Sequence, residues 1–369
     1  MKSDSLRHVV FAVAQFMLAA VATASPDKAD NSPMAAEQEA RNDRAGPRHA
    51  PAKNLPVPAE LTPEVAAAVA QPYGSPLWNL NAPNAAAWHE IVAKSVAVDA
   101  PKLAAARAAL GVSLTPTTVG GIPAFWLEPN VVPPNHRGQV IVNIHGGGWV
   151  FGPGESGTTE AMLLAAHGGY RVLAIDYRMP PDSPFPAALD DLVAAWRELV
   201  KTTDPRHIGV EGTSAGGNLT LAMMLRLKAE GLPMPAAIAP GSPVSDLTKT
   251  GDSYATNEWV DNVLVTYDGF LSRGIDLYAH GHDLRNPLIS PIHGDFSGLP
   301  PAIFTTGTRD LLLSDTIRAH RKMRQAGVPA ELNVFEGLSH AQFSLTPDAP
   351  DAKEAYGEIA SFFDRYLSR

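Results

Sequence analysis

Short apolar runs recur along the second half of the chain, and they predict the strands of a sheet. These runs cover residues 140–144, 172–175, 208–211, 236–239, 303–306 and 332–334. Stretches with helical character alternate with them over residues 188–201, 215–230, 315–325 and 352–367. Such alternation is typical of an α/β fold, in which helices cover both faces of a mostly parallel central sheet. Residues 115–119 and 122–127 alternate in polarity on either side of Gly120-Gly121, which predicts an antiparallel strand pair.

Residues 1–24 have the layout of a secretory signal peptide. Lys2 and Arg7 precede an apolar stretch over residues 9–21, and Ala22-Thr23-Ala24 offers small side chains for cleavage. The stretch is short for a membrane span, which needs about 20 apolar residues. We therefore expect export to the periplasm or the exterior, with no stable membrane span after cleavage. An uncleaved membrane anchor and a cytoplasmic start are the weaker alternatives.

The rest of the chain divides into three parts. Residues 25–56 combine Ala, Pro, Asn and charges of both signs with few large apolar side chains, which predicts a flexible linker. Residues 57–112 predict N-terminal cap helices over 64–70 and 85–110, although their Ala-rich faces fit plain packing equally well. Residues 113–369 predict the main α/β domain. The alternation of strands and helices in this domain is interrupted at about 242–292, where several aromatic residues indicate a second cap segment.

Composition and charge narrow the class of protein further. With 369 residues, 45% of them hydrophobic, the chain can bury one large core, which favours one capped α/β domain over two independent domains. The formal net charge of −9 and the lack of a basic cluster argue against a nucleic-acid partner, because phosphates require Lys or Arg. The chain has no cysteine, which excludes disulfides and a cysteine nucleophile. The sequence leaves open whether the chain forms a homodimer.

The run Gly212-Thr213-Ser214-Ala215-Gly216 lies between a predicted strand and a predicted helix. A G-x-S-x-G pattern in this context produces a sharp turn that leaves the serine hydroxyl exposed for nucleophilic attack. Gly212 and Gly216 lack a Cβ atom, so strand and helix can approach closely around the serine. The start of the helix also directs backbone N–H groups toward the reacting centre. Taken alone, the pattern fits a chance Gly-Ser-Gly turn about as well.

A glycine run follows an earlier predicted strand as His145-Gly146-Gly147-Gly148-Trp149. Acyl transfer requires donors where negative charge develops on the carbonyl oxygen, and backbone N–H groups of a glycine loop can supply them. We expect the N–H groups of Gly146, Gly147 and Ala215 to form such an oxyanion hole. A phosphate-binding loop is the weaker interpretation, because no G-x-x-x-x-G-K pattern occurs. We expect His145 and Gly148 to support the loop, with His145 structural rather than catalytic.

Two further candidates follow the last predicted strands. Asp310 lies after residues 303–306, and His340 lies after residues 332–334. A serine needs a base to accept its proton, and the base needs a carboxylate that orients its ring. The chain order Ser214, Asp310, His340 matches the order in α/β hydrolases. Asp315 is the rival acid, but we interpret it as a residue at the start of a helix.

The sequence offers little support for a metal or cofactor. His280, His282 and Asp283 lie close together, but they do not complete a metal-ligand pattern, and no H-E-x-x-H occurs. We therefore expect no metal, and a small molecule as the reaction partner. Asp176, Tyr177 and Arg178 are expected to brace the glycine loop rather than to take part in chemistry.

Five ordered segments together resemble the hormone-sensitive-lipase family of bacterial esterases. They are HGGGW, DYRMPPDSPFPAALDD (176–191), GTSAGGN, TGTRDLLLSD and GLSHAQF, and the resemblance runs from about Val119 to Arg369. Thr213 stands where many members carry Asp, which resembles a GTSAG branch of the family. SHAQF around His340 departs from the commoner His-Gly-Phe, which puts the substrate preference in doubt but not the mechanism.

The resemblance implies an α/β-hydrolase fold with a helical cap, no cofactor, and a catalytic domain that hydrolyses carboxylic esters. The resemblance implies that Ser214, Asp310 and His340 correspond to the family's catalytic triad. It likewise implies that Gly146, Gly147 and Ala215 supply the oxyanion donors. The expected function is thus a serine carboxylesterase that acts on short- to medium-chain esters through an acyl-enzyme. A lactonase, amidase or acyltransferase with the same triad is an alternative. A non-catalytic ligand-binding relative is a minor one.

Overall fold

The computed structural model describes residues 45–48, 50–73 and 76–367. The chain divides into two units, Met1–Val57 and Pro58–Arg369, and the second unit contains all the helices and strands reported below. The expected signal peptide lies outside the described residues, as does most of the expected linker. The described part of that linker, residues 45–48 and 50–56, contains no helix or strand.

The second unit is built on an eight-stranded sheet with the order β1-β2-β4-β3-β5-β6-β7-β8. The strands β1 and β2 form an antiparallel hairpin, β2 pairs antiparallel with β4, and all other neighbours are parallel. The mostly parallel sheet predicted from the apolar runs is therefore confirmed. The strand bounds are β1 Val112–Val119, β2 Ile122–Pro129, β3 Val140–Asn143, β4 Arg171–Ile175, β5 Ile208–Thr213, β6 Ala237–Gly241, β7 Ala302–Gly307 and β8 Ala330–Phe335.

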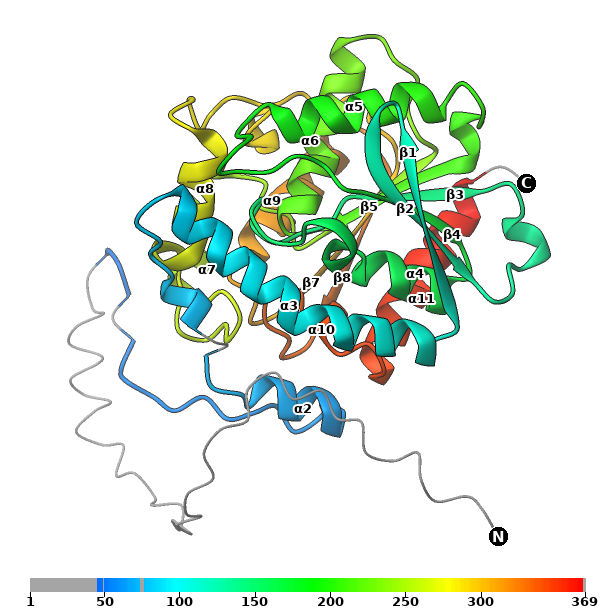
Figure 1. Cartoon of the computed structure of the whole chain (residues 1–369). Helices are drawn as coiled ribbons and strands as arrows, with labels where there is room; N and C mark the ends of the chain where they lie inside the picture. The colour runs from blue at the N-terminus through cyan, green and yellow to red at the C-terminus, as the bar shows by residue number, and fades with distance from the viewer. Residues whose placement is uncertain (1–44, 49, 74–75, 368–369) are drawn as a thin grey trace, which may run out of the picture. The chain divides into compact units, whose positions relative to one another are not determined.

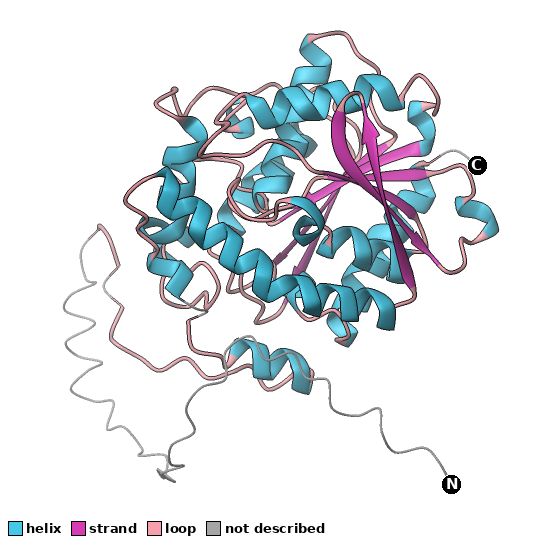
Figure 2. Ribbon diagram, viewed as in Figure 1, coloured by secondary structure: helices cyan, strands magenta, loops and turns pink. Residues whose placement is uncertain are grey.

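Helices cover both faces of the sheet (Figure 1). One face packs against α4 (Thr159–Gly168) and α11 (Pro350–Tyr366), and the other against α5 (Ala187–Leu199), α6 (Ala215–Ala229) and α9 (Leu313–Gln325). Each face has its own apolar core. In β3, Val140 and Val142 belong to the core with α5 and α6, whereas Ile141 belongs to the core with α4 and α11. This alternation follows from the two-residue period of a strand. Figure 2 shows the twisted strands between the two helical layers.

Helix α4 is absent from the sequence-based prediction. Its residues 161–165 are all buried, between the sheet and α11. A helix that is apolar on most sides does not produce the one-sided pattern from which surface helices are recognised. The other helices that cover the sheet begin and end within a few residues of their predicted bounds.

The two segments expected to form a cap contain helices and contact each other. The N-terminal segment has α2 (Pro63–Val69), the 3₁₀ turn η1 (Pro76–Asn79) and α3 (Ala85–Ala109). The later segment has α7 (Ser253–Thr256), the π turn η5 (Tyr267–Leu271) and α8 (Ser272–Ala279). Phe270 of η5 packs against Trp88 of α3, with ring centroids 6.4 Å apart, and against Phe151, at 5.3 Å. Shorter elements complete the fold: η2 Pro134–His136, η3 Gly154–Gly157, η4 Pro205–His207, η6 Pro291–His293 and α10 Gln342–Leu345.

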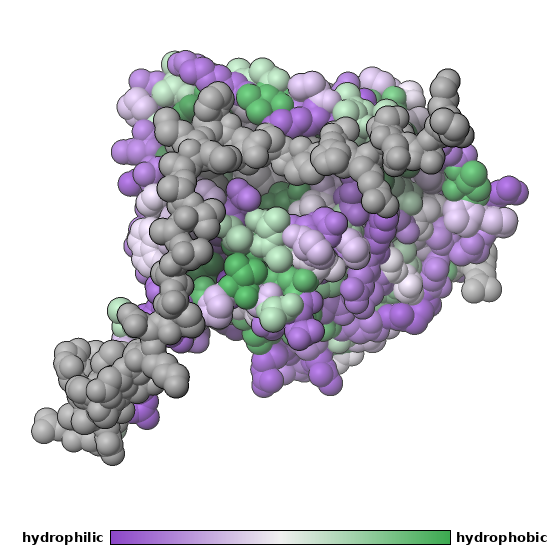
Figure 3. Space-filling model, turned by 90° about the horizontal axis from the view of Figure 1, so that it is seen from below, coloured by the Kyte–Doolittle hydropathy of each residue, from purple (hydrophilic) through white to green (hydrophobic). Residues whose placement is uncertain are grey.

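The surface seen from below in Figure 3 carries hydrophobic residues in its middle and hydrophilic residues around them. Mixed surfaces of this kind are ordinary, because a folded chain has too little polar surface to cover itself. Among the helices of the described ranges, none has both the length and the apolar character that crossing a membrane requires.

Two glycines set how closely β5, α6 and the end of β3 approach one another. A Cβ atom on Gly216 would lie 1.9 Å from the carbonyl oxygen of Ile144, and one on Gly212 would lie 2.3 Å from the same oxygen. Both distances are far shorter than any real carbon–oxygen contact. Because the obstructing atom belongs to the backbone, no side-chain rotation can relieve the clash. The turn between β5 and α6 therefore requires glycine on both sides of Ser214.

We predict that Gly216→Ala destabilises the protein by about 3 kcal/mol or more, because the added methyl displaces backbone in the centre of the sheet. Gly357→Ala is the matched control, since a Cβ at Gly357 in α11 meets no atom within 4 Å. Alanine favours a helix over glycine by about 1 kcal/mol, so this variant should melt at the wild-type temperature or above it. Urea unfolding of the two variants measures the difference. A Gly216→Ala protein as stable as wild type would contradict the close approach.

Candidate active site

Ser214 occupies a strained turn between β5 and α6. Its φ and ψ angles are 61° and −119°, a region that residues with a side chain rarely adopt. The Ser214 N–H donates to the carbonyl oxygen of Gly241 at 2.9 Å, and its own carbonyl accepts from Asn218 N–H at 3.0 Å. Such strain costs on the order of 1–3 kcal/mol and persists where the surrounding structure enforces it. The sharp turn predicted from the G-x-S-x-G pattern is therefore present.

The glycine loop after β3 lies directly beside Ser214. A Cβ atom on Gly146 would be 3.4 Å from the Cβ atom of Ser214. Gly147 has a φ angle of 101° and Gly148 one of 60°, so the loop depends on conformations that glycine adopts without cost. Within the described ranges, the N–H groups of Gly146 and Gly147 donate to no other group. Ala215 is the first residue of α6, where a helix leaves its N–H groups without internal partners.

The glycine loop is supported by side chains that follow β4 and by one side chain of the loop itself. The buried His145 ring stacks on Tyr177 at 4.3 Å and donates from Nδ1 to the Gly146 carbonyl at 2.8 Å. The Tyr177 hydroxyl donates to the His145 carbonyl at 2.7 Å, and Asp176 accepts from Gly154 N–H at 2.9 Å. Burial lowers the pKa of His145, which keeps its ring neutral. These contacts suit the supporting role expected for His145.

The expectation for Arg178 was wrong. Its guanidinium forms hydrogen bonds to Asp191 of α5 at 2.7–3.0 Å rather than to the glycine loop. Arg178 therefore ties the end of β4 to α5. Proximity to Tyr177 in the sequence suggested a shared role, but the buried carboxylate of Asp191, distant in sequence, is the partner of the guanidinium.

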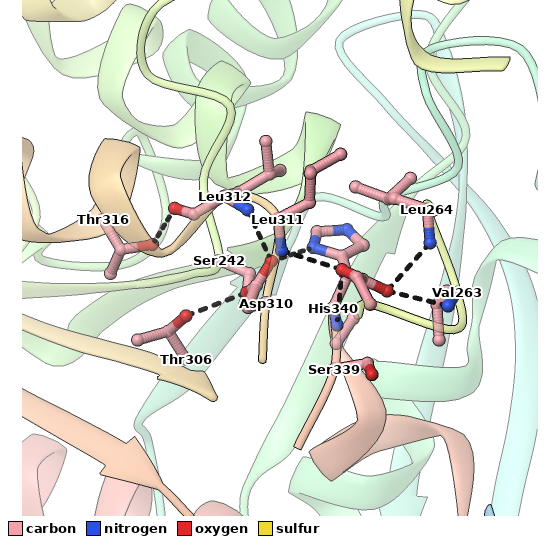
Figure 4. A network of polar contacts seen from close by, with 12 residues as sticks. Ser242, Val263, Leu264, Thr306, Asp310, Leu311, Leu312, Thr316, Ser339 and His340 are labelled. Atoms are coloured by element: carbon pink, nitrogen blue, oxygen red, sulfur yellow. Dashed lines mark hydrogen bonds and ion pairs between the residues drawn. The ribbon is translucent and has the colours of Figure 1, made fainter. Parts of the chain in front are cut away.

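His340 and Asp310 meet on two loops that follow β8 and β7. His340 Nδ1 lies 3.0 Å from Asp310 Oδ1, and the two residues are 4% and 0% exposed. The other oxygen of Asp310 accepts from the hydroxyls of Ser242, at 2.5 Å, and Thr306, at 2.8 Å (Figure 4). The Leu312 N–H also donates to Asp310, at 2.8 Å. Both oxygens of the carboxylate therefore have hydrogen-bond partners, and Oδ1 is the one that contacts the imidazole.

Asp315, the rival acid, has different neighbours. It is the third residue of α9, fully buried, and accepts from Asp246 N–H at 3.0 Å and from the Tyr254 hydroxyl at 3.1 Å. His340 is not among its partners. The geometry favours Asp310 over Asp315 as the carboxylate that orients His340.

No hydrogen bond joins Ser214 to His340 in the described part of the chain. Both residues follow the carboxyl ends of parallel strands, where open α/β sheets carry their chemistry. Hydrogen bonds between nucleophile and base often form fully only when substrate is bound. The structure therefore shows the contact between His340 and Asp310, and a contact between Ser214 and His340 remains a prediction.

The charges around His340 favour its protonated form. Burial lowers the pKa of His340, but the charge and hydrogen bond of Asp310, with the charges of Asp261 and Glu160, outweigh burial and leave the pKa raised. Burial raises the pKa of Asp310, yet its contact with His340 and its hydrogen bonds from the Ser242 hydroxyl and the Leu312 N–H leave that pKa lowered. The surroundings therefore stabilise the imidazolium that would form if a neutral His340 removed a proton from a serine.

Sequence reasoning missed a buried acidic pair close to Ser214. Glu211 of β5 and Glu160 of α4 share a hydrogen bond, Asn143 donates to Glu211 at 2.6 Å, and Glu160 also contacts Thr213. Burial raises the pKa of both carboxyl groups, and the repulsion between them raises that of Glu211 further. Two adjacent buried carboxyls keep at least one proton between them. Glu160 was unrecognised because α4 itself was missed.

Within the described residues, no group of three or more His, Cys, Asp and Glu side chains could hold a metal ion. His282 instead packs its ring against Phe185, with centroids 5.2 Å apart. His280 ends α8 in the left-handed conformation.

Fold and site together define the class of α/β hydrolases. A family model described as "alpha/beta hydrolase fold" matches residues 141–344. The chain is 35% identical over 249 residues to an acetyl-hydrolase of Streptomyces hygroscopicus, which covers 67% of this chain and 81% of that protein. It is 31% identical over 253 residues to a putative acetyl-hydrolase, LipR, of Mycobacterium tuberculosis, covering 68% and 80%.

Solved structures agree with this class. The crystal structure of esterase E25 is 38% identical with a TM-score of 0.81, covering 87% of this chain and 99% of that one. An esterase described as bacterial hormone-sensitive lipase family is 33% identical with a TM-score of 0.66, covering 71% and 90%. The chain belongs to the hormone-sensitive-lipase family of α/β hydrolases.

We predict that Asp315 makes the free energy of unfolding fall as the pH rises. Burial raises its pKa to about 8, so the folded protein holds a proton that the unfolded chain releases above about pH 4. Keeping that proton costs increasing free energy from about pH 4 up to pH 8. Asp315→Asn should therefore reduce the difference in melting temperature between pH 5 and pH 8, and should melt above wild type at pH 8. An equal pH dependence in both proteins would contradict this. The control is Asp283→Asn, because Asp283 is exposed.

Proposed function

We propose that this carboxylic-ester hydrolase is a serine carboxylesterase in which Ser214 is the nucleophile, His340 the general base and Asp310 the acid that orients it. The observation that carries the proposal is the buried contact of 3.0 Å between His340 and Asp310. It lies in the same unit as a strained serine that has a glycine loop beside it. Nucleophile, base and orienting acid are the groups that acyl transfer requires.

The proposed reaction proceeds in two halves. Ser214 Oγ attacks the ester carbonyl carbon and gives its proton to His340 Nε2, while Nδ1–H keeps its hydrogen bond to Asp310. The N–H groups of Gly146, Gly147 and Ala215 stabilise the negative charge on the carbonyl oxygen. His340 then returns the proton to the alkoxide, and an alcohol leaves. Water, deprotonated by His340, attacks the acyl-enzyme and releases the carboxylic acid and free Ser214.

Short- to medium-chain esters are the proposed substrates. Relatives carry the names acetyl-hydrolase and, at 29% identity, ethyl acetate hydrolase of Pseudomonas putida. Phe270 also lies against the glycine loop, where its ring occupies the space that a Cβ atom on Gly148 would need. An aromatic wall at this point favours compact acyl groups. Residues 242–292 and 57–112 are proposed to form the cap that sets this preference.

Export is part of the proposal. It rests on the arrangement of Lys2, Arg7 and the apolar residues 9–21, all outside the described residues.

We expect Ser214→Ala to lose at least a thousandfold in kcat on p-nitrophenyl acetate and butyrate, because no other group can form the acyl-enzyme. Wild-type protein should also be labelled by a fluorophosphonate, and the variant should not. A folded wild-type protein that resists labelling would favour the non-catalytic alternative. Faster turnover of lactones or anilides than of linear esters would favour a lactonase or amidase on the same residues.

Asp310→Asn should lower kcat by about 10⁴-fold, because the amide holds the imidazole in the wrong tautomer. Asp315→Asn is the matched control, with the same change in a buried carboxyl that does not touch His340, and it should stay within a few-fold of wild type. Ester hydrolysis at pH 8 measures both. The reverse ranking would transfer the orienting role to Asp315.

A further inference from the structure

Another buried acid, Asp261, joins the segment 242–292 to both loops of the proposed base and acid. Its side chain is 0% exposed. Oδ1 accepts from the N–H groups of Val263, at 2.7 Å, and Leu264, at 3.0 Å. Oδ2 accepts from Leu311 N–H at 2.8 Å and from His340 N–H at 3.2 Å. Four backbone donors from three separate segments thus converge on one side chain.

The two bonds to Oδ2 hold the backbone on both sides of the imidazole–carboxylate contact. Leu311 directly follows Asp310, and the second donor is the N–H of His340 itself. A single oxygen therefore fixes the separation of two loops that are 30 residues apart in sequence. A shift of either loop changes the 3.0 Å distance between His340 Nδ1 and Asp310 Oδ1. Displacements of about 1 Å at a reacting group can lower the rate 100-fold.

Neighbouring side chains of the same turn reinforce this connection. Asn257 donates from Nδ2 to the backbone carbonyls of Asp310, at 2.8 Å, and Thr308, at 3.1 Å. Asn262 donates to the carbonyl of Ala68 in α2 at 2.9 Å, and its own N–H donates to the Ser339 hydroxyl at 3.2 Å. The turn 257–262 thus connects α2 with the loops that carry Asp310 and His340.

The charge of Asp261 adds a second effect. His340 faces carboxyl groups from three elements: Asp310 after β7, Asp261 in the turn 257–262, and Glu160 in α4. The negative charge of Asp261 helps to raise the pKa of His340, while burial and the charge of Asp310 raise the pKa of Asp261 to about 6. Above that pH Asp261 is ionised, and it stabilises the imidazolium that forms when His340 takes a proton. A neutral Asn or Ser at this position could also accept hydrogen bonds from the backbone N–H groups of the turn. It would not supply the negative charge that stabilises the imidazolium.

We propose that Asp261 is a positioning residue for ester hydrolysis, which holds the loops of His340 and Asp310 in register and supports the protonated imidazole by its charge. This inference rests on the proposed function of Ser214, His340 and Asp310. It assigns to the segment 242–292 a direct part in aligning the base, besides any role in covering substrate.

The test is Asp261→Asn, assayed with p-nitrophenyl butyrate over a range of pH. We expect kcat to fall roughly 10- to 100-fold with KM within a factor of about two, because the reacting groups are displaced while substrate contacts remain. The acid limb of the kcat/KM profile should also move to lower pH, because loss of the negative charge lowers the pKa of His340. A purely structural role would leave that limb in place. Unchanged kcat, or an unmoved limb in a folded variant, overturns the proposal.

Two further variants keep the result interpretable. Asp283→Asn is the matched control, because Asp283 is an exposed residue of the same segment that accepts the N–H of Arg285 at 2.9 Å. It should keep wild-type kcat and pH profile. The double variant Asp261→Asn with Asp310→Asn should lose little more than Asp310→Asn alone, since Asp261 acts through the same pair. Fully additive losses would contradict an action through that pair.

If Asp261→Asn does not fold, Asp261→Glu takes its place. It keeps the charge and lengthens the side chain by one methylene, so kcat should fall while the acid limb stays near that of wild type. Wild-type kcat in a folded Asp261→Glu protein overturns the proposal. An active Ser214→Ala protein would instead refute the proposed function itself, whatever the Asp261 variants show.

Discussion

The hydrogen bond between His340 and Asp310 is the interaction on which the proposed chemistry depends. Both side chains are almost completely buried, so a charge on either one is costly unless the other compensates it. Asp310 is further held by Ser242 and Thr306, which leaves one oxygen directed at the imidazole. The sheet makes this meeting possible, because its parallel strands end at the same edge. Residues 30 positions apart are therefore brought to a single contact.

Around this contact the protein accumulates features that do not favour stability. Ser214 has a strained backbone, and Glu160, Glu211, Asp261 and Asp315 are buried acids with raised pKa values. A carboxyl group with a raised pKa lowers the free energy of unfolding at neutral pH relative to acid pH. Strain and buried charge of this kind concentrate at functional sites, where the rest of the fold must offset them. The two apolar cores that enclose the sheet supply that offset.

Much of the architecture could be predicted because each local pattern agreed with its place in the fold. The apolar runs became strands that are buried on both faces, as in β3, β5 and β7. The glycines of the G-x-S-x-G pattern correspond to backbone approaches that exclude any side chain. The failures have equally local causes. Helix α4 lacks a polar face, and Arg178 was assigned by its position in sequence although it contacts Asp191.

The sequence by itself determined the strands of the sheet, most of the helices that cover it, the family, and the candidates Ser214, Asp310 and His340. Periodicity, glycine spacing and chain order are properties of the chain that need no coordinates. Only the tertiary structure shows that Asp310, and not Asp315, contacts His340, because both are acids within six residues of the chain and differ in what they touch. It alone revealed Asp261 and the pair Glu160–Glu211. Their significance comes from burial and from long-range contacts, which no local pattern records.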